Sequence, residues 1–489
     1  MKRFPEKRIA DRTQLVAICV LLLCCALIPL LTGLDGNRSS VSADPAPAVS
    51  ASAYTAAVSA SAVATSAFSS DAAASGFDPT TAMSDPAPAA APSAAESATL
   101  LPSPTAERLR IAVGSDLHLN PDNTDRSGEL SQVLYSPELA EALLWDASQR
   151  GAELMLLTGD LVNGGREYRH RALTEILQRA EEDGLTVCVL PGNHDLDPIG
   201  QQEFARLYAE FGYREAYSRD TASLSYCVRY RDLMILMMDT GGYNHAVIDL
   251  PDAPRRENNT AFFSETTLRW TEALLKEAAE NGLHVLCAGH YNLLPEISRN
   301  PEGIGYYVEN GERFADLLRS YGVPLYLSGH MHTQAVYQEK GLTELLTEYL
   351  LGYPTGYSML DLTQDGLRFT PCRVDVDAWA AETGQTDPVL LGFTEWQEGN
   401  LRSYSEENIR YMTERNPLNA KEKELAADFF YEAMKSFWDG SMHRRRAELE
   451  AMPGYQPFFR CAEGYAYGWW LKDLIRTASP LLGGFRLEW

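Results

Sequence analysis

The chain has 489 residues, 45% of them hydrophobic, which is enough for two or three independently folding domains. Its formal net charge of −25 excludes a general binder of nucleic acids or of anionic membranes, since such a protein needs a basic surface. The charge does not exclude a phosphate substrate, because bound divalent metals can reverse the sign of a site locally.

The N-terminal segment, residues 1–38, is predicted to be a signal peptide or a membrane anchor. Residues 15–34 are 20 mostly apolar residues, long enough to span a bilayer as a helix. Basic residues precede this stretch, and the positive-inside bias then places everything after it outside the cytoplasm. Alternatively, residues 41–43 (VSA) are a small-residue cleavage site and the protein is secreted. Both alternatives predict an extracytoplasmic protein, and only the first keeps it attached to the membrane.

Residues 39–107 are rich in Ala, Ser and Pro and contain almost no large apolar side chains, as in SDPAPAAAPSAAES. Such a segment cannot bury enough surface to offset the entropy lost on ordering. It is therefore predicted to be a disordered linker that separates the N-terminal segment from the folded part of the chain.

Residues 108–375 alternate between strand-like and helix-like stretches, which is typical of an α/β domain. The apolar, β-rich runs lie at 109–116, 154–160, 185–192, 283–290 and 323–330, and helix-like segments lie at 136–151, 168–184 and 266–282. The last of these helices is expected to end at Gly282. Residues 223–240 are predicted to form two adjacent antiparallel strands, and residues 357–374 a hairpin that turns at Asp365-Gly366.

Residues 376–489 are predicted to form a mainly helical, aromatic-rich C-terminal region, with the clearest helix at 420–440. The aromatic residues concentrate in YQPFFRCAEGYAYGWWL, residues 455–471. They either pack the helices together or form a platform for a glycan or another ligand. Packing is favoured, because buried aromatic rings are the common case.

Five of the strand-like runs end in side chains that can bind metals. In chain order these are Asp116 and His118, Asp160, the trio Asn193, His194 and Asp195, then His290, and finally His330 and His332. Five of the nine histidines of the chain occupy these strand ends. The carboxyl ends of strands in an open α/β sheet face one crevice, so the side chains are expected to converge. The ligand types suit divalent Mn, Fe or Zn.

Each strand end taken alone is explained by an ordinary turn, since Gly, Pro, Asn and Asp are all turn formers. A turn does not readily explain five such ends in order. The ordered motifs DLH, GD, GNHD, GH and GHMH resemble those of the calcineurin-like metallophosphoesterases, over roughly residues 108 to 375. The resemblance implies a four-layer sandwich of two mixed β-sheets flanked by helices, with a dinuclear metal centre at the strand ends.

The resemblance also implies a role for each matching residue. Asp116, His118 and His332 would hold the first metal, Asn193, His290 and His330 the second, and Asp160 would bridge both. His194 would stabilise the transition state or protonate the leaving oxygen, and Asp195 would orient His194. The chain departs from the family where His and Pro often follow the fourth-motif histidine, because here the run is GHYNLL. Tyr291 and Asn292 in this run either contact the substrate or only shape the loop.

These observations predict an exported, metal-dependent phosphoesterase that hydrolyses phosphate mono- or diesters of small molecules by attack of a metal-bridging hydroxide. The alternative is a non-catalytic binding protein of the cell envelope that retains the dinuclear metal site. The enzyme is favoured, because His194 and Asp195 are present although metal binding does not require them. Specificity is expected to lie in loops such as 241–260, where Arg255 and Arg256 either contact a substrate anion or face solvent.

Overall fold

The computed structural model describes residues 108–122, 131–241, 261–294, 307–477 and 484–488. The predicted signal or anchor segment (1–38) and linker (39–107) lie outside these ranges, as do Arg255 and Arg256. Among the described residues, none of the helices combines the length and apolar character needed to cross a bilayer.

The first sheet has six strands in the order β13-β12-β11-β1-β2-β3. These strands are β1 (Leu109–Gly114), β2 (Leu154–Leu157), β3 (Thr186–Val189), β11 (Gly356–Thr363), β12 (Gly366–Arg373) and β13 (Phe485–Leu487). Strands β1, β2 and β3 run parallel, whereas β11 is antiparallel to β1. The sheet is therefore mixed.

The second sheet has seven strands in the order β4-β5-β6-β7-β8-β10-β9. These strands are β4 (Ser218–Arg219), β5 (Tyr226–Tyr230), β6 (Leu233–Met237), β7 (His284–Ala288), β8 (Leu325–Ser328), β9 (Ala335–Glu339) and β10 (Leu342–Leu346). The predicted antiparallel pair is β5 and β6, and β6, β7, β8 and β10 run parallel. This sheet is mixed as well.

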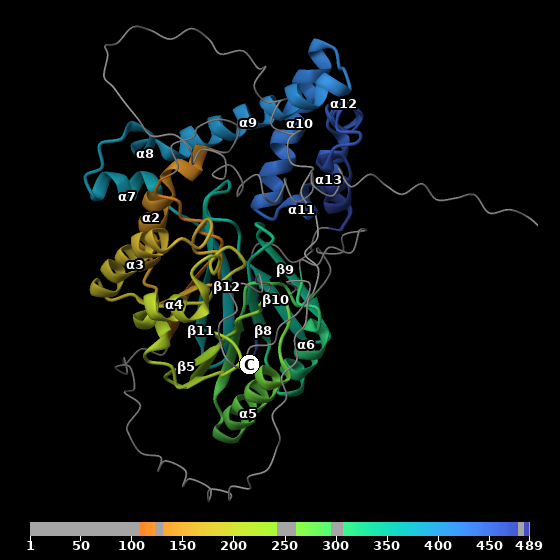
Figure 1. Cartoon of the computed structure of the whole chain (residues 1–489). Helices are drawn as coiled ribbons and strands as arrows, with labels where there is room; N and C mark the ends of the chain where they lie inside the picture. Colours follow the sequence, from red (N-terminus) through yellow and green to blue (C-terminus); the bar gives the residue numbers. More distant parts are fainter. Residues whose placement is uncertain (1–107, 123–130, 242–260, 295–306, 478–483, 489) are drawn as a thin grey trace, which may run out of the picture. The chain divides into compact units, whose positions relative to one another are not determined.

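The two sheets share one core and helices cover their outer faces, which confirms the predicted four-layer sandwich. Along β6, Leu233, Ile235 and Met237 belong to the core shared with the first sheet, whereas Met234 and Leu236 belong to the core under α5 and α6. Figure 1 shows α2 and α3 on one side of the sheets and α5 and α6 on the other. These helices are α2 (Ser136–Gln149), α3 (Glu167–Glu182), α5 (Glu265–Asn281) and α6 (Gly311–Ser320). The same part of the chain also contains α4 (Gly200–Leu207) and the short helical segments η1 (Ser131–Tyr135) and η2 (Ala209–Tyr213).

Helix α5 and the β11–β12 hairpin show how local sequence sets the element ends. The Ser264 side chain caps the first turn of α5, and Gly282 ends the helix in the left-handed conformation, with φ 64°. The predicted end at Gly282 is therefore confirmed. The hairpin turn lies one residue earlier than predicted, at 364–365, because Thr363 pairs with Gly366. Gly366 is needed there because a side chain would collide with the carbonyl oxygen of Leu487 in β13.

The C-terminal region is mainly helical, as predicted. Its helices are α7 (Val376–Glu382), α8 (Pro388–Leu391), α9 (Phe393–Arg415), α10 (Ala420–Trp438), α11 (Met442–Ala451), α12 (Tyr455–Cys461) and α13 (Ala466–Thr477). Asn419 and Glu422 form a capping box at the start of α10. The rings of Phe429, Phe430 and Phe458 are fully buried against one another, which supports packing rather than a platform for these rings. The boundary at residue 375 stays a prediction.

The end of α10 contacts the segment that follows His332. The backbone N–H of Gln334 donates a hydrogen bond to the carbonyl oxygen of Trp438, and the Thr333 hydroxyl donates to that of Phe437. Both Thr333 and Gln334 are buried. The helical region thus supports the last of the strand-end segments.

Candidate metal centre

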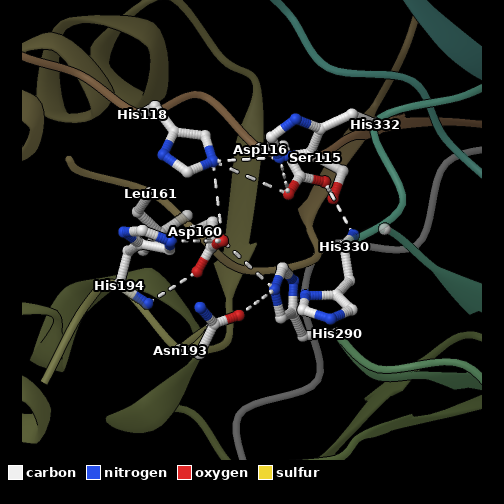
Figure 2. Close-up of polar contacts among 12 residues, drawn as sticks. Ser115, Asp116, His118, Asp160, Leu161, Asn193, His194, His290, His330 and His332 are labelled. Atoms are coloured by element: carbon white, nitrogen blue, oxygen red, sulfur yellow. Dashed lines mark hydrogen bonds and ion pairs between the residues drawn. The ribbon is translucent and has the colours of Figure 1, made fainter. Parts of the chain in front are cut away.

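The structure brings the nine predicted site residues together at the carboxyl ends of five strands. Asp116 and His118 follow β1, Asp160 follows β2, and Asn193, His194 and Asp195 follow β3. His290 follows β7, and His330 and His332 follow β8. Figure 2 shows His118, His194 and His290 around the Asp160 carboxylate, with Asp116, His330 and His332 beside them.

Five of these residues have a left-handed backbone, which is uncommon for side chains other than glycine. They are Asp116, His118, Asp160, His330 and His332, with φ between 40° and 67°. Only three other non-glycine residues of the described chain share this conformation: Arg231, Lys340 and Thr355. Backbone strain of this kind costs roughly 1–3 kcal/mol per residue and persists where the surrounding structure enforces it, often at functional sites. Here it turns each side chain sharply off the end of its strand.

The first group of ligand atoms comes from Asp116, His118, Asp160 and His332, and these atoms all lie within 4.8 Å of one another. Asp116 Oδ1 is 3.3 Å from His332 Nε2 and 3.8 Å from His118 Nε2. Asp160 Oδ2 is 3.5 Å from His118 Nε2. These are the residues predicted for the first metal, together with the predicted bridging carboxylate.

The second group contains Asp160, His290 and His330. Asp160 Oδ2 is 3.3 Å from His290 Nε2, and the Asn193 side-chain oxygen lies 3.2 Å from the same nitrogen. Asp160 is therefore the one residue that both groups share. That position between the two groups is the one a bridging ligand requires.

The donor atoms fit divalent metals better than they fit one another. Asp116 Oδ1 is buried without a hydrogen-bond donor, although imidazole nitrogens surround it. The Nε2 atoms of His118 and His332 face each other at 3.3 Å, and only one of them can carry the proton of a hydrogen bond between them. His290 donates from Nδ1 to the Thr158 carbonyl oxygen, which leaves Nε2 available as a ligand. Carboxylate, amide and imidazole donors suit Mn, Fe or Zn.

The electrostatics of the site also favour cations. Burial by itself would raise the pKa of Asp160, but the facing charges of His290 and His194 outweigh it and hold the pKa below its usual range. Burial opposes protonation of His290, yet Asp160 raises the pKa of this imidazole to about 9. Burial and His290 lower the pKa of His330 to about 3. The two ligand carboxylates, Asp116 and Asp160, therefore stay ionised, as metal binding requires.

His194 lies at the edge of the site. Its side chain is 18% exposed, compared with 2% for His118 and Asp160. Its Nε2 is 4.0 Å from Asp160 Oδ2, and its backbone N–H donates to Asp160 Oδ1. His194 belongs to neither group of metal-ligand atoms. As the one histidine of the cluster outside both groups, and with a partly exposed side chain, it is placed to meet a substrate from solvent.

Asp195 does not take its predicted position beside the His194 imidazole. Its carboxylate is buried and accepts hydrogen bonds from the backbone N–H groups of Gly192, Leu161 and Val162. These bonds tie the loop after β3 to the loop after β2. A carboxylate turned into the loops cannot orient the imidazole of the preceding residue, so Asp195 acts on the Asp160 and Asn193 segments instead.

Two supporting residues were not predicted. His170 in α3 is fully buried and bonds the Asp195 carbonyl oxygen through Nε2 and the Tyr208 hydroxyl through Nδ1. Tyr349 stacks on the His332 ring at 4.5 Å and meets His118 edge-on. The only sequence signal for His170 is its position on the buried face of a predicted helix. Tyr349 has no sequence signal other than its position after the last motif.

Tyr291 and Asn292 shape the loop after β7, which is one of the two alternatives left open by the sequence. Asn292 is 2% exposed, and its amide donates to the Ser328 hydroxyl and the Glu344 carboxylate. The Tyr291 ring is 8% exposed and lies 4.0 Å from the His330 ring. Both side chains are therefore buried within this part of the structure.

Comparison with known proteins matches two parts of the chain. The model of a family described as calcineurin-like phosphoesterase matches residues 109–334, and one described as the C-terminal domain of cyclic nucleotide phosphodiesterase matches residues 375–472. A relative, tartrate-resistant acid phosphatase type 5 of Oryctolagus cuniculus, is 28% identical over 191 residues. That alignment covers 35% of this chain and 53% of the relative, so the chain spans about half of the relative's length.

Solved structures with detectable similarity include a dimetal phosphatase from Danio rerio, with a TM-score of 0.41 and 16% identity. The match covers 54% of this chain and 96% of that one. A purple acid phosphatase from yellow lupin (Lupinus luteus) has a TM-score of 0.36 and 14% identity, covering 55% of this chain and 52% of that one.

Proposed function

We propose that this protein hydrolyses small-molecule phosphate esters, with diesters as its preferred substrates, because residues 109–334 match the model of the calcineurin-like phosphoesterase family. The observation that carries the proposal is the position of Asp160 between two groups of metal-ligand atoms. The preference for diesters rests on the match of residues 375–472 to the C-terminal domain of cyclic nucleotide phosphodiesterase.

The chain's own residues divide the work of this reaction. Asp116, His118 and His332 would hold one divalent ion, and Asn193, His290 and His330 the other, with Asp160 between them. When bound, such ions supply Lewis acidity toward the phosphate oxygens and a more acidic water molecule. The buried carboxylates keep the ligand set negative, which offsets part of the charge of two dications.

His194 would complete the site from its exposed edge. Its imidazole, whose pKa burial lowers to about 4, can donate a hydrogen bond to the ester oxygen that leaves, or a proton when it is protonated, because it belongs to neither group of metal ligands. The hydrogen bond from the His194 backbone N–H to the Asp160 carboxylate keeps His194 next to the metal centre. Acid catalysis and metal binding are thereby assigned to neighbouring but separate residues.

A phosphomonoesterase is the second candidate, supported by the match to tartrate-resistant acid phosphatase. The two candidates differ in the ester that is turned over. Both candidate functions use the same metal centre. The choice between the two esters is expected to depend on loops such as 242–260, which lie outside the described residues.

The full chain with added Mn is expected to hydrolyse bis(p-nitrophenyl) phosphate with a higher kcat/KM than p-nitrophenyl phosphate. Cyclic nucleotides are the biological diesters to test next, by measuring the nucleoside monophosphates that their hydrolysis releases. A monoester preference would move the assignment to the second candidate. Two bound ions per chain without turnover of any ester would instead favour the non-catalytic binding protein of the cell envelope.

We further propose that the enzyme acts outside the cytoplasm, attached through residues 15–34 or secreted after cleavage. The support is the apolar N-terminal stretch with basic residues before it. Protease added to intact cells is expected to digest the phosphoesterase domain if it is anchored, and the culture supernatant is expected to contain it if it is cleaved. A domain protected in intact cells and absent from the medium would contradict export.

A further inference from the structure

Glu344 is a fully buried glutamate in β10 that the reaction above does not use. Its neighbours two residues away, Leu342 and Leu346, belong to the apolar core under α5 and α6. A carboxylate on this face is costly unless hydrogen bonds compensate its burial. A reason for its presence therefore has to be found in its partners.

The partners of Glu344 come from the loop after β7 and from the last residue of β8, which leads into the loop that carries His330. The backbone N–H groups of Leu293 and Leu294 donate to the carboxylate, the latter at 2.7 Å. The Ser328 hydroxyl donates to it at 2.8 Å, and the Asn292 amide at 3.2 Å. The Asn292 amide also donates to Ser328 at 3.0 Å, so the three side chains close a triangle.

Each of these loops carries a ligand of the second metal. Asn292 lies two residues after His290, and Ser328 lies two residues before His330. The Gly329 N–H donates to the His290 carbonyl oxygen at 3.1 Å, and the rings of His290 and His330 lie 5.1 Å apart. Strands β8 and β10 are parallel neighbours, labelled next to each other in Figure 1, and Glu344 is paired with Tyr326, two residues before Ser328.

We propose that Glu344 is a positioning residue for the second metal site: its carboxylate ties the segment after His290 to the segment before His330 and so sets the spacing of the two imidazoles. The inference rests on the metal centre of the proposed function. It assigns Glu344 no contact with substrate and no effect on the first metal group, whose residues come from other loops and from His332.

The test is a titration of the metal-free full chain with Mn, in the wild type and in Glu344→Gln. The glutamine amide keeps the shape of the glutamate side chain. Its NH₂ group, however, faces N–H and O–H groups that donate to the carboxylate in the wild type. We expect one ion to bind with unchanged affinity and the other to bind about 10- to 100-fold more weakly, the usual effect of losing a partner that holds a ligand. The variants His118→Ala and His290→Ala identify which step of the titration belongs to which site.

Glu348→Gln is the matched control, because Glu348 is also buried and the substitution is identical, while no hydrogen bond joins it to the described residues of the two loops. It is expected to leave the second-site affinity unchanged.

If Glu344→Gln does not fold, Ser328→Ala provides the test, with a smaller loss at the same site, less than about 10-fold. Unchanged second-site affinity in folded Glu344→Gln, or equal weakening of both ions, overturns the proposal. Absence of turnover by a wild type that binds two ions would defeat the proposed function and leave this result standing.

Discussion

Replacing Asp160 by Asn is expected to lower kcat/KM by on the order of 10³-fold or more and to reduce the bound metal below two ions per chain. Asp160 Oδ2 is the one carboxylate oxygen that faces histidines of both groups, at 3.5 Å from His118 Nε2 and 3.3 Å from His290 Nε2. The substitution removes the negative charge where two dications would meet. The asparagine keeps a side-chain oxygen that can accept the hydrogen bond from the His194 backbone N–H, so the loop after β3 should keep its conformation.

Metal analysis and kinetics of the same preparation separate the two parts of this prediction. Asp361→Asn is a suitable control, since Asp361 pairs with Arg108 and Arg110 near the C-terminal end of β11, away from the site. It should retain two ions and full turnover. An Asp160→Asn enzyme that keeps both ions and the wild-type rate would exclude a centre bridged by this carboxylate.

The ligand residues could be predicted because their signal is local in the sequence. Each lies within a few residues of the end of an apolar strand, and parallel strands bring their carboxyl ends to the same edge of a sheet. The mixed sheets followed from the same motifs, through the family they resemble. No long-range pairing had to be inferred to name Asp160 or His290.

The supporting contacts could not be predicted, because their partners are far apart in the sequence. Asp195 bonds Leu161, 34 residues away, and Glu344 bonds Asn292, 52 residues away. Adjacency in GNHD suggested that Asp195 serves His194, whereas three backbone N–H groups bind its carboxylate. Gly366 was assigned to the hairpin turn because glycine is common there, but the approach of β13 is what requires it. Local patterns identify ligands, and only the fold identifies what holds them.

Replacing His194 by Ala is expected to reduce kcat by about 10²- to 10⁴-fold while both metals stay bound, because His194 lies outside both groups of ligand atoms. Its imidazole is the most exposed of those facing Asp160, so its loss should affect chemistry more than folding. His443→Ala, an exposed histidine in α11, is the matched control and should leave kcat unchanged.

The choice of substrate then distinguishes the two roles left open for His194. If it protonates the leaving oxygen, His194→Ala should lose far more rate on an alkyl ester than on a p-nitrophenyl ester, whose leaving group needs no proton. If it only stabilises charge on the phosphate, the loss should be the same for both esters. Asp195 does not hold the imidazole, whose Nε2 lies 4.0 Å from Asp160 Oδ2, too far for a hydrogen bond, so a leaving oxygen can take this N–H and the first pattern is the one expected. An equal loss on both esters would assign His194 to charge stabilisation alone, and loss of a metal ion would show that His194 is itself a metal ligand.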